Sequence, residues 1–174
     1  MEYAVKEMIS RQDIAARVEE IAAELNADFA GREVVFVCIL KGAAVFMADL
    51  MRHLKLDMSV EYLELVSYDF TESRGKVDMI KDFDNDISGK DVVIVEDIID
   101  TGMTVNFIGE HLRAKNPASI KYCVLLDNPV RREADCTNPD YTGFVIPNQF
   151  VLGYGLDLDG KYRQLPFIGS LVKV

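Results

Sequence analysis

The sequence has little positive charge, few cysteines and no long apolar run. Its 174 residues include 19 lysines and arginines against 29 aspartates and glutamates, which gives a formal net charge of −10. Nucleic-acid binding requires a basic surface, so nucleic acid is not expected as a partner. An acidic chain that binds a phosphorylated ligand must instead use local backbone donors, a few well-placed cations or a metal ion.

The three cysteines, Cys38, Cys123 and Cys136, cannot all pair with one another and show no metal-ligand spacing. Cys38 and Cys123 lie in apolar segments, where a thiol usually serves as a small buried hydrophobe. A reducing, cytoplasmic setting is therefore expected.

Membrane insertion and export are not expected either. No apolar run approaches the ~20 residues that are needed to span a bilayer. The N-terminal segment 1–10 lacks the apolar h-region of a signal peptide.

The chain shows no repeat, low-complexity tract or long linker, so residues 1–174 are expected to form a single domain. Four segments are predicted as strands: 33–40, 59–68, 91–96 and 119–127. Three segments have the apolar spacing of helices: 10–26, 42–53 and 104–115. Strands that alternate with helices predict an α/β fold with an open, mainly parallel sheet flanked by helices.

Ligands of such sheets bind at the carboxyl ends of the strands. This rule brings three loops together: Leu40 to Gly42, Glu96 to Thr104, and Asp127 to Arg132. The candidate site is therefore expected at this edge of the sheet.

The middle loop contains Thr101, Gly102, Met103 and Thr104 directly before a predicted helix. Unpaired N–H groups and the helix dipole favour a phosphate at a helix N-terminus. Gly102 lets the backbone close tightly around the phosphate, and the two threonines offer hydroxyl donors. The GxxxxGK[ST] motif is absent, so this is not the loop of a nucleotide triphosphatase.

Glu96, Asp97 and Asp100 precede this loop. Adjacent carboxylates would repel a phosphate, but they suit vicinal sugar hydroxyls or a hydrated Mg²⁺. A ribose 5-phosphate with a substituent at C1, within reach of Asp100, satisfies every part of the segment. The alternative is a solvated acidic loop with a helix cap, because Asp and Thr are ordinary cap residues. The buried strand before the loop and the helix after it favour the ligand site.

The segment VVIVEDIIDTGMTV, residues 92–105, resembles the phosphoribosyl-pyrophosphate motif of the type I phosphoribosyltransferases. Five further segments resemble, in order, the hypoxanthine-guanine branch of that family: ILKGAAVFMADLMRH, VSYDFTESRG, LLDNPVRR, YTGFVIPNQFVLGYGLD and KYRQLPFIG. The resemblance spans residues 33–170.

The resemblance implies a fold, a reaction and partners. The fold would be that of the type I phosphoribosyltransferases, with a small hood built from the terminal segments and a mobile active-site loop. The reaction would transfer the phosphoribosyl group of phosphoribosyl pyrophosphate to hypoxanthine or guanine in purine salvage, with Mg²⁺ as cofactor. A homodimer or homotetramer is expected from the family.

The resemblance also implies roles for individual residues. Asp100 would be the general acid/base at purine N7. The sugar hydroxyls would be held by Glu96 and Asp97, and Mg²⁺ by Asp157 together with these two. The other substrate-binding residues would be Lys41, Gly42, Ser67, Tyr68, Ile99, Thr101, Gly102, Met103, Thr104, Asn128, Phe150, Val151 and Arg163.

Some of these roles are more specific. The Leu40–Lys41 peptide is expected to be cis and to present a backbone N–H to pyrophosphate, which Arg163 would also bind. Phe150 would stack on the purine, and Val151 would read its edge through backbone groups. Ser67 and Tyr68 would open the loop that closes over the site.

Asn128 departs from the family pattern, which usually has a lysine that donates to the 6-oxo group of the base. An ammonium only donates hydrogen bonds, whereas an amide also accepts them. Discrimination for the 6-oxo group is therefore predicted to weaken by about 1–3 kcal/mol. Lys121, Arg131 or a water molecule could equally supply the missing donor.

Two other functions compete with this interpretation. One is a phosphoribosyltransferase that prefers xanthine or another purine. The other is a regulator that senses phosphoribosyl pyrophosphate and binds nucleic acid, which the net charge of −10 disfavours. His53 and His111 fall on predicted helices without an evident carboxylate or cysteine partner and are interpreted as structural.

Overall fold

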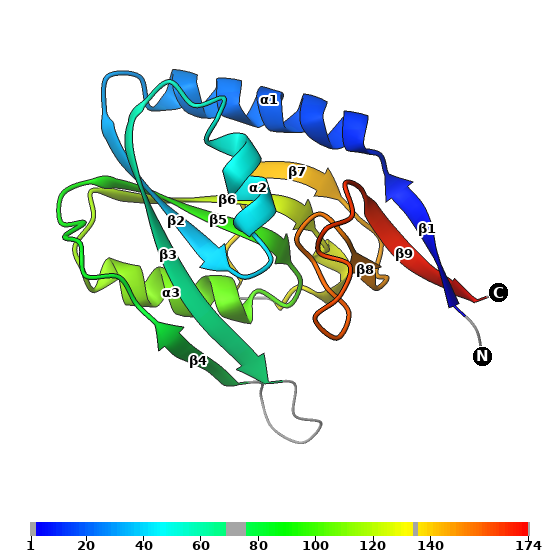
Figure 1. Cartoon of the computed structure of the whole chain (residues 1–174). Helices are drawn as coiled ribbons and strands as arrows, with labels where there is room; N and C mark the ends of the chain where they lie inside the picture. The colour runs from blue at the N-terminus through cyan, green and yellow to red at the C-terminus, as the bar shows by residue number, and fades with distance from the viewer. Residues whose placement is uncertain (1–2, 69–75, 134–135, 174) are drawn as a thin grey trace.

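The computed structural model describes residues 3–68, 76–133 and 136–173 (Figure 1). Its larger sheet has the strand order β4-β3-β2-β5-β6-β7. The strands are β2 (Glu33–Leu40), β3 (Asp57–Tyr68), β4 (Lys76–Lys81), β5 (Asp91–Ile99), β6 (Ser119–Asp127) and β7 (Tyr141–Val145). All neighbours are parallel except β4, which runs antiparallel to β3 at the edge. The predicted mainly parallel α/β sheet is confirmed.

Helices cover both faces of this sheet (Figure 1). The helices are α1 (Arg11–Asp28), α2 (Ala44–Leu50) and α3 (Met103–Arg113). Alternate residues of β2 face opposite layers, since Phe36 packs in the cluster with α1 and α2, whereas Val37 packs in the cluster with α3. Because side chains alternate along a strand, a strand buried on both faces reads as a continuous apolar run.

A second, antiparallel sheet forms the hood that the resemblance implied. It has the order β1-β9-β8 and contains β1 (Tyr3–Ile9), β8 (Val151–Leu152) and β9 (Ile168–Lys173). In Figure 1 the first and last strands lie side by side beyond one end of the larger sheet. The hood therefore joins the two terminal segments of the chain beside the predicted site.

Several predicted boundaries need correction. Helix α2 begins at Ala44 and ends at Leu50, so it is shorter than the predicted 42–53, and Lys41 and Gly42 form a turn before it. Strand β5 continues to Ile99, which places Glu96 and Asp97 within a strand and not in the following loop. The segment 76–81, for which no strand was predicted, pairs with β3 as strand β4. Long-range pairing fixes these strands, and local sequence patterns do not report it.

The cysteine prediction is confirmed for the two thiols in the apolar strands. Cys38 and Cys123 are fully buried in the core. Burial raises the pKa of the Cys38 thiol to about 12 and also raises the pKa of the Cys123 thiol. Both thiols therefore stay protonated and serve as small hydrophobes. Among the described helices, none combines the length and the apolar character that crossing a membrane would require.

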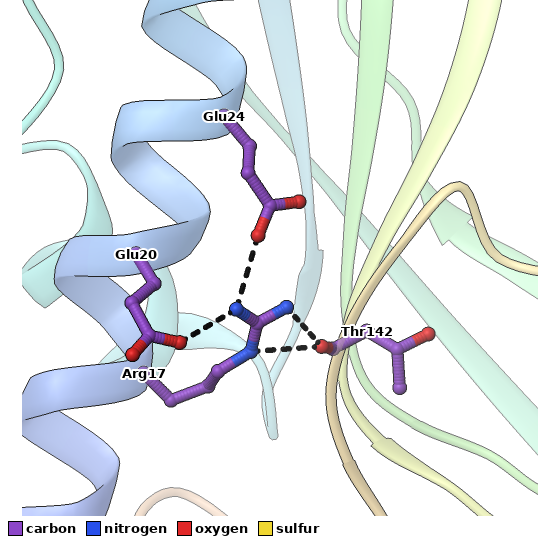
Figure 2. Close-up of polar contacts among 4 residues, drawn as sticks. All are labelled: Arg17, Glu20, Glu24 and Thr142. Carbon is purple, nitrogen blue, oxygen red and sulfur yellow. Dashed lines mark hydrogen bonds and ion pairs between the residues drawn. The ribbon is translucent and has the colours of Figure 1, made fainter.

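Arg17 fastens α1 to the edge strand β7 (Figure 2). Its Nε and Nη2 atoms donate to the backbone oxygen of Thr142 at 3.1 and 2.8 Å. Its Nη1 atom donates to Glu20 at 2.8 Å and to Glu24 at 3.0 Å. The carbonyl of an edge strand, which could otherwise pair with another chain, is thus capped from within the molecule.

Replacing Arg17 with Met is expected to lower the free energy of unfolding by about 1–2 kcal/mol, because the carbonyl of Thr142 loses both of its charged donors. Urea unfolding followed by circular dichroism measures the loss. Arg11→Met, at an exposed position of the same helix, is the matched control and should change stability little. Equal losses in the two variants would contradict a specific role for the contact with β7.

Candidate active site

A cavity of about 350 Å³ opens at the carboxyl ends of β2 and β5. It is bounded by the turn after β2, the end of β5 with the first turn of α3, and a segment that follows β6. The predicted site residues that line it are Lys41, Gly42, Glu96, Asp97, Ile99, Asp100, Thr101, Gly102, Met103, Thr104, Asp157 and Arg163. Most of the residues named from the sequence therefore meet at the predicted edge of the sheet.

The loop before α3 is shaped as an anion cradle. Gly102 is the residue before the helix and has a φ of 90°, a left-handed conformation that glycine adopts without strain. A side chain there would also overlap the thiol of Cys136. The carbonyl of Thr101 accepts from the backbone N–H of Glu133 at 3.0 Å, which fixes the loop. The first backbone N–H groups of α3 lie at the end of the helix that borders the cavity.

Glu96 and Asp97 form a carboxylate pair at the floor of the cavity. Glu96 is only 6% exposed, and burial together with the charge of Asp97 raises its pKa well above the ordinary value. Burial also raises the pKa of Asp97, although the positive charge of Arg163 opposes the shift. The pair is costly to ionise in this buried position, so hydroxyl donors or a cation would bind it favourably.

Two glycines allow the backbone to close against this pair. A Cβ atom at Gly42 would lie 1.5 Å from the Oδ2 atom of Asp97, and one at Gly155 would lie 2.1 Å from the backbone oxygen of Gly42. No larger residue fits at either position without moving Asp97 or the turn after β2. The Leu40–Lys41 peptide in this turn is cis, as the resemblance implied.

Arg163 and Asp157 lie together on the hood side of the cavity. Arg163 donates to Asp157 at 2.7 Å and to the backbone oxygen of Gly155 at 2.6 Å. The other carboxylate oxygen of Asp157 accepts from the backbone N–H of Gly160 at 2.7 Å. The hood thus supplies the cavity with one oriented cation and one oriented carboxylate.

Asp100 is held by two donors from the segment after β6. The Nη1 atom of Arg131 lies 2.5 Å from its Oδ2 atom, and the Nδ2 atom of Asn128 lies 3.2 Å from its Oδ1 atom. The backbone N–H of Asn128 donates to Ile99 at 2.9 Å, which anchors this segment to the end of β5. Both oxygens of Asp100 are therefore held by donors from the protein.

Three predicted residues with described side chains, Asn128, Phe150 and Val151, lie outside the cavity lining. Phe150 is 52% exposed and Val151 is buried in β8. Ser67 and Tyr68 end strand β3, and their side chains and the predicted loop at 69–75 fall outside the described residues. Asn128 is 3% exposed and reaches the site through Asp100.

Two contacts were not anticipated. Arg131, one of the alternative donors to the 6-oxo group, lines the cavity, and its contact with Asp100 had no sequence signal. The interpretation of His111 without a carboxylate partner was wrong, because its Nε2 atom lies 2.8 Å from Asp82. Lys115 binds the same carboxylate at 3.0 Å, and Asp82 has a lowered pKa, since these bonds and that of the Phe83 backbone N–H outweigh its burial. This cluster joins α3 to the segment after β4 and supports a structural role for His111.

Comparison with known proteins gives a consistent result. A family model described as the phosphoribosyl transferase domain matches residues 5–159. The chain is 41% identical over 175 residues to the hypoxanthine phosphoribosyltransferase of Salmonella typhimurium, covering 99% of this chain and 98% of that protein. It is 40% identical over 164 residues to the hypoxanthine-guanine-xanthine phosphoribosyltransferase of Tritrichomonas foetus, covering 94% of this chain and 90% of that protein.

A solved structure also matches closely. The crystal structure of a hypoxanthine-guanine phosphoribosyltransferase from Bacillus anthracis has a TM-score of 0.91 and 43% sequence identity to this chain. The match covers 99% of this chain and all of that one, 100%. Both the cavity-forming sheet and the hood lie within the matched region.

Proposed function

The chain belongs to the phosphoribosyl transferase family, and we propose that it transfers the 5-phosphoribosyl group of phosphoribosyl pyrophosphate to hypoxanthine and/or guanine. The products are IMP or GMP and pyrophosphate, which is a purine salvage reaction. One observation carries the proposal: an anion cradle, a buried carboxylate pair and an oriented third carboxylate line a single cavity. A ribose 5-phosphate with a reactive C1 complements these three features.

The geometry gives each group a task. The N–H groups at the start of α3 bind the 5-phosphate, with the hydroxyls of Thr101 and Thr104 beside them. Glu96 and Asp97 accept hydrogen bonds from the sugar hydroxyls, which fixes the ring and directs C1 toward Asp100. As the purine nitrogen attacks C1 and pyrophosphate leaves, Asp100 handles the proton at N7.

The opposite wall of the cavity suits the leaving group. Arg163 is a charged donor that matches pyrophosphate oxygens, and the backbone N–H of Lys41 adds a neutral donor. The side chain of Lys41 lies 3.7 Å from Glu64. Phe150 offers a face for stacking the base, and Val151 offers backbone groups to its edge.

The carboxylates of this cavity suit a Mg²⁺ ion that is bound in part by the substrate. No cluster of three His, Cys, Asp or Glu side chains able to hold a metal occurs among the described residues. Mg²⁺ commonly takes one or two carboxylates and completes its shell with substrate phosphates and waters. One or two of Asp157, Glu96 and Asp97 would hold it together with substrate oxygens, and the ion would neutralise charge on the departing pyrophosphate.

The remaining expectations are part of the same proposal. Residues 1–174 would act as one phosphoribosyltransferase domain in the cytoplasm, without a membrane or nucleic-acid partner. A homodimer or homotetramer is expected, and sedimentation velocity would determine which forms. The segment from Ser67 onward would close over the site and exclude water from the reacting C1.

A purine panel tests the proposed function. Pyrophosphate release is measured with hypoxanthine, guanine, xanthine and adenine, each with Mg²⁺ and with EDTA. Hypoxanthine or guanine should give the highest kcat/KM, and EDTA should abolish release. No release with any of the four bases would contradict the proposal.

A shifted base preference is the second candidate, and Asn128 in place of the usual lysine favours it. Xanthine as the best substrate in the same panel would establish this alternative. A regulator that senses phosphoribosyl pyrophosphate is a weaker candidate, since its nucleic-acid surface would have to form on a chain with a net charge of −10. Binding of leader RNA in a gel-shift assay without pyrophosphate release would favour the regulator.

A further inference from the structure

The amide of Asn128 has no donor left for the purine. Its Nδ2 group must face Asp100 at 3.2 Å, because a carboxylate only accepts hydrogen bonds. The same nitrogen lies 3.5 Å from the Oδ1 atom of Asn148. Both N–H bonds of the amide are therefore directed at protein acceptors, and the remaining Oδ1 atom is buried without a hydrogen-bond partner in the structure. An acceptor cannot bind a 6-oxo group, so the donor for this group must come from elsewhere.

Two other cations, one in β6 and one in the segment after it, are engaged elsewhere. Lys121 donates to Asp140 at 2.8 Å and lines a different cavity together with Ser119, the first residue of β6. The guanidinium of Arg132 pairs with the buried Asp127. Neither cation lines the cavity that holds Asp100.

Arg131 is placed differently. It lines the cavity, its side chain is 49% exposed, and one of its nitrogens lies 2.5 Å from Asp100. On a purine, the 6-oxo group and N7 are neighbours on one edge. A guanidinium bound to the carboxylate that faces N7 has further N–H groups, which reach the adjacent oxo group without releasing Asp100.

We propose that Arg131 is the specificity-determining residue that donates to the 6-oxo group of the purine while it orients Asp100. Asn128, supported by Asn148, positions the other oxygen of Asp100 and does not read the base. The inference rests on the proposed function, because it requires Asp100 to face N7. Among the donors considered for the 6-oxo group, Asn128, Lys121, Arg131 and a water molecule, it selects Arg131.

The other charged groups of the cavity do not compete for this role. Lys41 and Arg163 line it from the turn after β2 and from the hood, where Arg163 is bound to Asp157. Glu96 and Asp97 are carboxylates and cannot donate to an oxo group when ionised. Arg131 is thus the cation in the cavity that the structure places against Asp100.

The test compares Arg131→Met with Lys121→Met as the matched control. Titration calorimetry measures the binding of IMP and of ribose 5-phosphate, and kinetics give KM for hypoxanthine and for phosphoribosyl pyrophosphate. Arg131→Met should weaken IMP binding and raise KM for hypoxanthine about 10- to 100-fold, the range expected for a charged hydrogen bond. Ribose 5-phosphate affinity and KM for phosphoribosyl pyrophosphate should change less than about twofold, and Lys121→Met should match the wild type.

A rescue strengthens the test. Adding Asn128→Lys to Arg131→Met restores a cationic donor beside Asp100, so it should recover most of the lost IMP affinity. Unchanged IMP affinity in Arg131→Met, with ribose 5-phosphate still bound, would overturn the inference alone. A wild-type chain that binds no ribose 5-phosphate would overturn the proposed function and the inference with it. Arg131 is half exposed, and circular dichroism verifies that each variant is folded.

Discussion

Asp100→Asn is expected to lower kcat about 10²- to 10⁴-fold, the usual contribution of a general acid/base. The amide keeps the size of the carboxylate but cannot take the proton from N7. It also cannot accept from both Arg131 and Asn128, because one of its two positions now carries hydrogens. The site is therefore expected to bind its ligands and fail at chemistry.

Single-turnover measurements of pyrophosphate release separate these two effects. The Kd for phosphoribosyl pyrophosphate should stay within about threefold of the wild type, since Asp100 does not contact the leaving group in the proposed arrangement. Asp159→Asn, an exposed aspartate in the segment between β8 and β9, is the matched control and should leave kcat unchanged. A fall in kcat of less than tenfold in Asp100→Asn would show that Asp100 is not the general acid/base.

Glu96→Gln is expected to stabilise the ligand-free protein at pH 8 and to weaken its binding of phosphoribosyl pyrophosphate. Burial raises the pKa of Glu96 in the folded state above its value in the unfolded chain. Such a group favours folding at low pH, where it is protonated, and this contribution is lost as the pH rises through the folded-state pKa. Stability of the wild type in EDTA should therefore fall between acidic and alkaline pH.

The glutamine variant should lose most of that pH dependence, because it keeps the oxygen that accepts from the Asp97 N–H at 3.1 Å but carries no charge. At pH 8 it should be more stable than the wild type, since it avoids the cost of ionising a buried carboxyl group. Its affinity for phosphoribosyl pyrophosphate should fall about 10- to 100-fold, the value of a charged hydrogen bond to the sugar.

Urea unfolding in EDTA at several pH values and calorimetry with the ligand measure the two effects. Glu110→Gln, on the exposed face of α3, removes the same charge at a solvated position and should change neither. A wild-type stability that does not change from pH 5 to 8 would show that burial does not raise the pKa values of the acid pair. A substitution that raises stability and lowers ligand affinity is typical of residues that bind a ligand at a cost to the stability of the fold.

The sequence predicted the local features of the site more completely than it predicted where the helices and strands around the site begin and end. The apolar run of β5, the acids at its end and the glycine before α3 are contiguous, so their order alone indicates a strand, a ligand loop and a helix. The hood strands were implied by family resemblance and not by pattern. Strand β8 has only two residues, and its Leu152 pairs with Gly169, 17 positions further along the chain, which leaves no local signal.

The sequence by itself determined the kind of ligand, since Glu96, Asp97 and the loop at Gly102 follow one another and their chemistry does not depend on distant residues. Only the tertiary structure decided which other groups complete the site. It placed Asp97 against Gly42, paired Arg163 with Asp157, and brought the amide of Asn128 and the guanidinium of Arg131 to the two oxygens of Asp100. The physical reason is that these contacts depend on how separate strands are arranged in the sheet and how the loops at their ends meet, and a linear pattern does not record such distances.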